Sequence, residues 1–225
     1  MKRNKTVLVM ALTLVFLAIA VPSQPVPVLR LSADGGAPVT ITDQLAGDMN
    51  PAVGAVTFLG PVGDFSFNVS TGFTKPILGS ALSPSMDLNS VDISSAASGT
   101  HNLVVEFSDT GFGPVNSAFH LGIGGTTSGS ILYQAFLDPA NVNFAPTTPL
   151  GSVGPLSVPA FAGSTNSSQI VLGGTFSLTQ RATISITGPG ITSFNATLAV
   201  PEPGLLLLLG AGLVSVGLLG SRLNR

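Results

Sequence analysis

The 225-residue chain contains no cysteine and no tryptophan, it has a single tyrosine, and only 8% of its residues are charged. Without cysteine the protein cannot form disulfides, use a thiolate nucleophile or bind zinc through sulfur. Its stability must therefore come from an apolar core. The lack of tryptophan and the single tyrosine disfavour carbohydrate recognition through stacking on these rings.

Positive charge is scarce between the two ends of the chain. Residues 21–200 hold three basic residues against nine acidic ones, a formal charge of −6, whereas the whole chain carries −2. Affinity for nucleic acids comes mainly from Lys and Arg that release condensed counterions, so an acidic domain repels a phosphate backbone. We therefore expect no nucleic-acid partner.

Apolar residues are abundant, at 44%, and glycine and proline are frequent. This composition differs from the low hydrophobicity and high charge that are typical of disordered chains. Gly, Pro, Ser, Thr and Asn favour tight turns between short strands. Once the hydrophobic ends are set aside, the length suits one domain at 21–199.

The first 20 residues have the three parts of a signal peptide. A basic start, made of Lys2, Arg3 and Lys5, precedes an uncharged apolar run at 6–20. Ala18 and Ala20 supply the small-x-small pattern that signal peptidase accepts. We predict cleavage after Ala20. The alternative is an uncleaved transmembrane helix, although the run is shorter than the ~20 apolar residues of a full span.

The other end of the chain has the features of a membrane anchor. Residues 204–220 carry no charge, and at ~1.5 Å per residue a helix of this length approaches the thickness of the hydrocarbon core. Arg222 and Arg225 follow directly. The positive-inside tendency places these arginines in the cytoplasm as a stop, so the preceding domain lies outside the inner membrane.

A short proline-rich motif stands directly before this predicted transmembrane helix, and it consists of Pro201, Glu202 and Pro203. The triplet, the apolar span and the terminal arginines, in this order over residues 200–225, resemble the PEP-CTERM sorting signal. This resemblance implies that the triplet is recognised by an exosortase, a membrane processing enzyme. It also implies a transient membrane hold at 204–220 and an association with exopolysaccharide and biofilm.

The physical properties of the triplet agree with such a role. Two prolines fix φ and resist helix continuation, so we expect an extended segment that presents Glu202 above the membrane. The alternative is that the prolines only end the helix, with Glu202 at its favourable N-terminus. The fixed order of the surrounding features favours sorting.

Alternation of apolar and polar residues predicts β-strands in the central domain. Four sets of residues should each face the core: Phe65, Phe67 and Val69; Leu103, Val105 and Phe107; Ala182, Ile184 and Ile186; Phe194, Ala196 and Leu198. The last two sets flank Gly188-Pro189-Gly190, which predicts a hairpin. Further strands are predicted within 39–42, 55–59, 90–94, 118–123, 131–137 and 170–178, with loops or edge segments within 141–159. The predicted fold is an antiparallel β-sandwich, with a jelly roll as the nearest variant.

The sequence offers no clear catalytic or metal-binding motif. His101 and His120 have no ligand spacing to a carboxylate, so we expect both to be surface or strand residues. A G-x-S-x-G elbow that would position a serine nucleophile is absent. Clustered oxygen ligands make calcium an alternative, at Asp43, Asp48 and Asn50 or at Asp87, Asn89 and Asp92, but neither set forms a D-x-D-x-D-G loop.

These observations lead to a functional expectation. We expect a non-enzymatic exported surface or matrix protein without a cofactor, metal or catalytic residue. Its expected partners are signal peptidase, the inner membrane, an exosortase-type enzyme and exopolysaccharide. After processing, the protein should reach the cell surface or the exterior. A carbohydrate- or partner-binding module is the alternative function, and a hydrolase is a third.

Overall fold

The structure is a computed structural model, and it describes residues 25–201. The described residues form fourteen β-strands, which pair antiparallel in two six-stranded sheets and one two-stranded sheet. Among these residues, no helix is long and apolar enough to cross a membrane. The predicted signal peptide at 1–20 and the predicted transmembrane helix at 204–220 lie outside the described residues.

The two large sheets have the following strand orders. Sheet A consists of β10 (Thr148–Leu156), β9 (Ser130–Asp138), β13 (Phe176–Thr187), β6 (Thr100–Phe112), β1 (Val28–Ala33) and β2 (Val39–Thr42). Sheet B consists of β11 (Ala160–Asn166), β8 (His120–Thr127), β14 (Gly190–Ala199), β5 (Ser85–Ser95), β4 (Phe65–Phe73) and β3 (Ala55–Val62). The small sheet pairs β12 (Ile170–Leu172) with β7 (Val115–Ser117).

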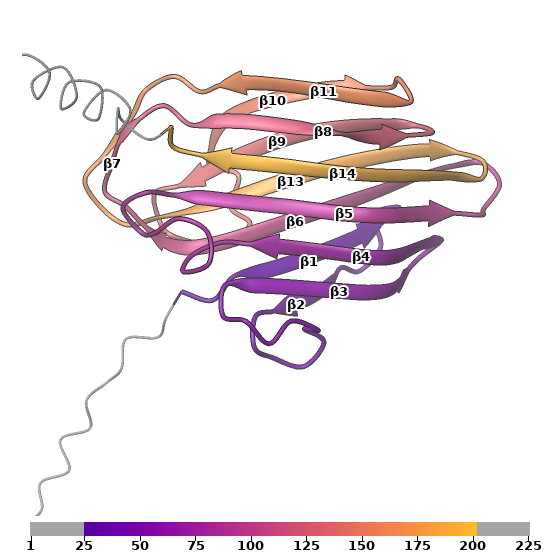
Figure 1. The fold of residues 1–225 in the computed structure, drawn as a ribbon, viewed down its shortest axis with the longest axis horizontal. Helices are drawn as coiled ribbons and strands as arrows, with labels where there is room; N and C mark the ends of the chain where they lie inside the picture. Colours follow the sequence, from indigo (N-terminus) through magenta and orange to yellow (C-terminus); the bar gives the residue numbers. More distant parts are fainter. Residues whose placement is uncertain (1–24, 202–225) are drawn as a thin grey trace, which may run out of the picture.

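Sheets A and B stack face to face with their strands nearly aligned, so that β14 lies over β13 and β5 over β6 (Figure 1). Their inner faces are apolar and fully buried, with Leu88 and Phe65 from sheet B meeting Phe107 and Tyr133 from sheet A. Two layers that interdigitate in this way form an aligned β-sandwich. The predicted antiparallel β-sandwich is therefore confirmed for the described residues.

The predicted hairpin around Gly188-Pro189-Gly190 is wrong. β13 pairs with β6 and β9 in sheet A, whereas β14 pairs with β5 and β8 in sheet B. The turn therefore carries the chain from one sheet to the other, and the two strands face each other across the core. Gly188 helps to fix this arch, because its N–H donates to the carbonyl of Gly99 in the connection from β5 to β6. A hairpin and an arch have the same alternation, so the pattern alone could not separate them.

The predicted inward faces are confirmed for β6, β13 and β14, whereas β4 departs from its pattern. Phe65 and Phe67 are buried as predicted, but Val69 is only half-buried, and Ser70 and Gly72 point inward in its place. The partner strand β5 changes parity at the same level, around Asp92, which has a φ of 53°. Such a β-bulge moves every later side chain to the opposite face.

The connection at 139–147 folds over the outer face of sheet A. The Phe144 N–H donates to the hydroxyl of Ser108 at 3.1 Å, and the hydroxyl of Ser177 donates to the Val142 carbonyl at 2.6 Å. Ser108 is consequently buried, although its place in the alternation predicted a solvent-facing position. The rest of the predicted loop-or-edge segment is β10, which does lie at the edge of sheet A. The predicted strand at 170–178 is divided between β12 and β13.

Candidate functional site

The described chain enters and leaves the sandwich at the same end (Figure 1). We call this the proximal end, and it contains Pro25 and Val200. The opposite or distal end carries the turns at 34–38, 63–64, 96–99 and 188–189. The long connections at 43–54, 74–84 and 139–147 lie at the proximal end, so the distal end is built mainly from short turns.

Only the first residue of the predicted sorting motif is described. β14 ends at Ala199, the Val200 N–H still donates to the Pro84 carbonyl at 3.0 Å, and Pro201 is exposed. The motif therefore begins within two residues of a central core strand. The other predicted sorting and processing residues lie outside the described part of the chain: Glu202, Pro203, Arg222, Arg225, Ala18 and Ala20.

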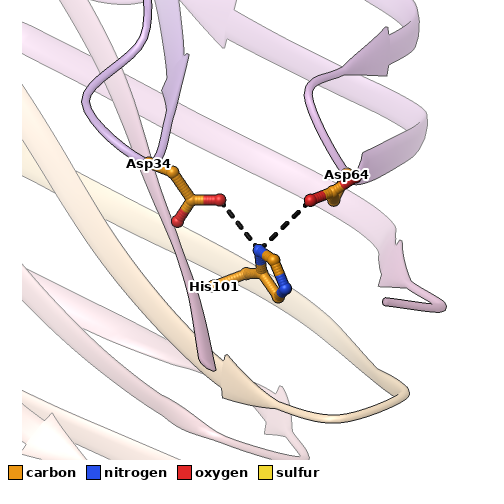
Figure 2. A group of neighbouring side chains, drawn as sticks. All are labelled: Asp34, Asp64 and His101. Atoms are coloured by element: carbon orange, nitrogen blue, oxygen red, sulfur yellow. Dashed lines mark hydrogen bonds and ion pairs between the residues drawn. The ribbon is translucent and has the colours of Figure 1, made fainter. Parts of the chain in front are cut away.

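Three side chains gather at the distal end, as Figure 2 shows. Asp34 follows β1, Asp64 lies between β3 and β4, and His101 is the second residue of β6. Nδ1 of His101 lies 2.9 Å from Oδ2 of Asp34 and 3.2 Å from Oδ2 of Asp64. Within residues 25–201, this is the one group of three such side chains with its possible ligand atoms within 4.8 Å of one another. We call it the distal triad.

The triad is held in place by the backbone around it. The Asn102 N–H donates to Oδ1 of Asp34 at 2.7 Å, and the Ser98 carbonyl lies 3.0 Å from Nε2 of His101. Gly63 brings Asp64 close, because a Cβ at that position would lie only 2.7 Å from the Cβ of Ala33. The triad thus joins one turn and the start of one strand of sheet A to one turn of sheet B.

Electrostatics favours a positive charge on the triad's imidazole. The hydrogen bond to Asp34, with support from the Ser98 carbonyl and the charge of Asp64, raises the pKa of His101 above its usual value. The Asn102 N–H and the contact with His101 lower the pKa of Asp34. The expectation that His101 is a strand residue is confirmed. Sequence spacing did not show its carboxylate partners, because they come from turns 67 and 37 residues away.

The remaining candidates from the sequence do not join this group. His120, at the start of β8, contacts Asn166 through Nδ1 at 2.8 Å. Asp48 uses its carboxylate within its own loop, where Oδ1 accepts from the N–H groups of Asn50 and Thr57, both at 2.9 Å. Oδ2 of the buried Asp43 accepts from the Gly54 N–H at 2.8 Å. These carboxylates stabilise the 43–54 connection.

A second polar cluster lies on the outer face of sheet A. Glu106 is buried, and its two oxygens accept from Arg30 Nε at 2.7 Å and Arg181 Nε at 2.8 Å. The Arg30 guanidinium lies 3.9 Å from the centre of the Phe144 ring, and that of Arg181 lies 5.0 Å from the Phe136 ring. These groups line an open groove that also contains Ser32, Gln134 and Thr183.

A third cluster is a buried ion pair near the proximal end. Lys75 Nζ lies 2.5 Å from Oδ2 of Asp109 and 2.5 Å from the Thr110 carbonyl, and it also stacks on Phe112. Burial raises the pKa of Asp109 and lowers that of Lys75. Because each charge is compensated within the fold, we interpret this pair as structural.

Comparison with known proteins adds no family. No family model matches the chain, and no curated protein matches it. Among the solved structures that overlap it weakly, a carbohydrate-binding module that recognises mannan is 11% identical over 62% of this chain and 90% of that chain, with a TM-score of 0.28. The enzymatically active domain of tailspike protein 4 from bacteriophage CBA120 is 15% identical over 73% of this chain and 18% of that chain, with a TM-score of 0.27. A structure of infectious bursal disease virus, Gx strain, is 13% identical over 80% of this chain and 56% of that chain, with a TM-score of 0.30. Likenesses at these TM-scores carry no argument about function, which must be argued from the residues themselves.

Proposed function

We propose that this chain is a non-enzymatic exported protein of the cell surface or extracellular matrix, held in the inner membrane by residues 204–220 until an exosortase-type enzyme processes it. The observation that carries the proposal is the position of Pro201, Glu202 and Pro203. They lie directly between the last core strand, which ends at Ala199, and the apolar span. A segment in this place is close to the membrane and cannot extend either the strand or the helix.

The arrangement of the sandwich is compatible with this topology. Because the chain leaves at the proximal end, that end faces the membrane while the predicted anchor is in place. The distal end then faces away from the membrane.

The test is a triple substitution of the motif, Pro201→Ala, Glu202→Ala and Pro203→Ala, in a bacterium with an exosortase. Residues 204–220 stay apolar, so membrane insertion should continue while processing fails. Full-length protein should accumulate in the inner-membrane fraction, and the mature form should disappear from the exterior. Fractionation with an antibody against the sandwich measures both.

Deletion of residues 204–225 is the matched control for this experiment. Without the apolar hold, the domain should reach the periplasm unsorted. Unchanged delivery to the exterior by the triple-alanine variant would contradict the proposal and leave residues 204–220 as a plain membrane anchor.

A second candidate function is binding of a carbohydrate on the outer groove of sheet A. Its support is the row of hydrogen-bonding groups offered by Arg30, Gln134 and Arg181, which are presented on a rigid sheet. Gln134→Ala should then weaken retention on immobilised exopolysaccharide without lowering the melting temperature. Equal retention of the variant and the wild type would exclude this groove.

A further inference from the structure

In the distal triad, one ring nitrogen and two carboxylate oxygens lie close together, and each of them can act as a hydrogen-bond acceptor. Nε2 of His101 faces the Ser98 carbonyl at 3.0 Å, and since a carbonyl only accepts, this nitrogen must carry a proton. In the neutral ring, Nδ1 then carries no hydrogen and has only a lone pair. It faces two carboxylate oxygens, at 2.9 and 3.2 Å, that also have only lone pairs to offer. Such an arrangement requires a cation among the three atoms, and the cation is either a proton on Nδ1 or a metal ion.

We propose that the distal triad binds a divalent transition-metal ion of the zinc class through Nδ1 of His101, Oδ2 of Asp34 and Oδ2 of Asp64. The remaining coordination positions are filled by water. This is a site additional to the proposed sorting function, and it does not depend on how the chain is exported.

The geometry fits such an ion. With zinc–nitrogen and zinc–oxygen bonds of about 2.1 Å, neighbouring ligands in a tetrahedral site lie roughly 3.4 Å apart. The two separations from Nδ1 are close to this value, and all three ligand atoms lie within 4.8 Å of one another. Access is open, because the side chain of Asp34 is 41% exposed and that of Asp64 is 55% exposed.

Groups outside the coordination shell are also in place. A histidine that binds a metal usually donates its other ring N–H to a carbonyl or carboxylate, which fixes the tautomer and orients the ring. The Ser98 carbonyl does this for His101, and the Asn102 N–H orients the carboxylate of Asp34. Both partners belong to the backbone of the β5–β6 connection and β6, so they are part of the fold.

The ligand types select the class of ion. Calcium and magnesium prefer sites made entirely of oxygen, and magnesium gives up its water reluctantly. One imidazole with two carboxylates suits zinc or a neighbouring first-row ion. Because Asp34 and His101 belong to sheet A and Asp64 to sheet B, the ion would cross-link the two sheets at the distal end.

The experiment is calorimetric titration of zinc chloride into the chelator-treated full-length chain in detergent at pH 7.5. We expect about one ion per chain, and removal of a ligand by His101→Asn or Asp64→Asn should weaken binding by at least roughly tenfold. His120→Asn is the matched control, because it removes an exposed histidine that contacts Asn166 and no carboxylate of the triad. Circular dichroism should show the same β content for every variant.

A second readout separates the metal from the proton. The carboxylates that face Nδ1 are Asp34 and Asp64, at 2.9 and 3.2 Å, so a proton and a metal ion compete for the same position on the ring. Zinc displaces any proton on Nδ1, so titrations near pH 6.5 in buffers of different ionisation enthalpy should show proton release on binding. Absence of zinc binding by the wild type, or equal affinity in His101→Asn, would overturn the site. Loss of binding in His120→Asn alone would also overturn it.

Discussion

Each of the three basic residues of the sandwich is held by a carboxylate. Arg30 and Arg181 share Glu106, and Lys75 pairs with Asp109. Glu106 compensates more charge than Asp109 does, because its one buried carboxylate lies between two guanidinium groups. Because the three basic residues pair with only two carboxylates, most of the nine acidic residues of the domain have no Lys or Arg partner within residues 25–201.

Replacing Glu106 with glutamine should destabilise the domain by about 2 kcal/mol. Breaking a buried ion pair costs roughly 3–5 kcal/mol, and the partial exposure of both arginines reduces that figure. The loss also leaves two like charges facing each other. Urea unfolding followed by circular dichroism measures the change. Asp92→Asn, at an exposed carboxylate, is the control and should stay within about 0.5 kcal/mol of the wild type; equal effects of the two variants would contradict the prediction.

The distal triad should make stability depend on pH in the metal-free protein. The pKa of His101 is raised from 6.5 in the folded state, so its contribution is present below 6.5 and is lost as the pH rises through the folded value. The pKa of Asp34 is lowered from 3.8, so its contribution is present above 3.8 and is lost as the pH falls. The advantage of the wild type over His101→Asn should therefore be largest between these limits.

The measurement is the melting temperature of both proteins in chelator from about pH 4 to pH 9, a range that covers both transitions. The difference should peak in the acidic range and disappear at alkaline pH. His120→Asn should show no such profile, and a difference that stays constant with pH would show that His101 acts only through packing.

The alternation of apolar and polar residues predicted where strands lie and which of their side chains face the core. It could not predict which strands pair with one another. The inward residues of β6, β13 and β14 follow directly from the sequence, because burial on one face requires period two. Whether Gly188-Pro189-Gly190 closes a hairpin or an arch depends on which strand arrives beside β13, and this is decided by residues far away in the chain. The bulge at Asp92 and the loop over Ser108 were missed for the same reason.

The distal triad was also beyond prediction from spacing. Asp34 and Asp64 lie in turns, and His101 lies at the start of β6. Only the stacking of the two sheets brings these three positions together. A turn aspartate is ordinary, since Asp favours turns for local reasons. A histidine next to a turn had no visible partner in the sequence. The sorting motif, in contrast, is a local pattern, and its prediction needed no fold.

Gly72 in β4 should be intolerant of a side chain. A Cβ at this position would lie 2.4 Å from the ring of Phe107 on the facing sheet. Gly72→Ala must therefore push the sheets apart or move Phe107, at a cost of about 1–3 kcal/mol for an overpacked core. The matched control is Gly173→Ala, where a Cβ would meet nothing within 4 Å. Chemical denaturation should separate the two variants, and equal midpoints would contradict the predicted steric contact.

The path of the chain couples the two sheets. It passes directly between sheets A and B from β2 to β3, from β5 to β6, from β8 to β9, from β10 to β11 and from β13 to β14. It also crosses from β6 to β8 through β7 and from β11 to β13 through β12. Neither sheet is therefore a continuous piece of sequence that could fold before the other. The inner faces share one buried core. We consequently expect the sandwich to unfold as a single cooperative unit.

Tyr133 provides the test of this cooperativity, because it is the only tyrosine in a chain without tryptophan. Its fully buried phenol on sheet A donates to the Thr197 carbonyl of sheet B at 3.0 Å and accepts from Gln180 Nε2 at 2.8 Å. Tyrosine fluorescence therefore reports contact between the sheets, whereas far-ultraviolet circular dichroism reports the strands themselves. For residues 25–201 expressed alone, without metal or reductant, both signals should change at the same urea concentration, as a two-state transition requires. A fluorescence change at lower urea than the dichroism change would mean that the sheets separate before they unfold, and the single-unit prediction would then be wrong.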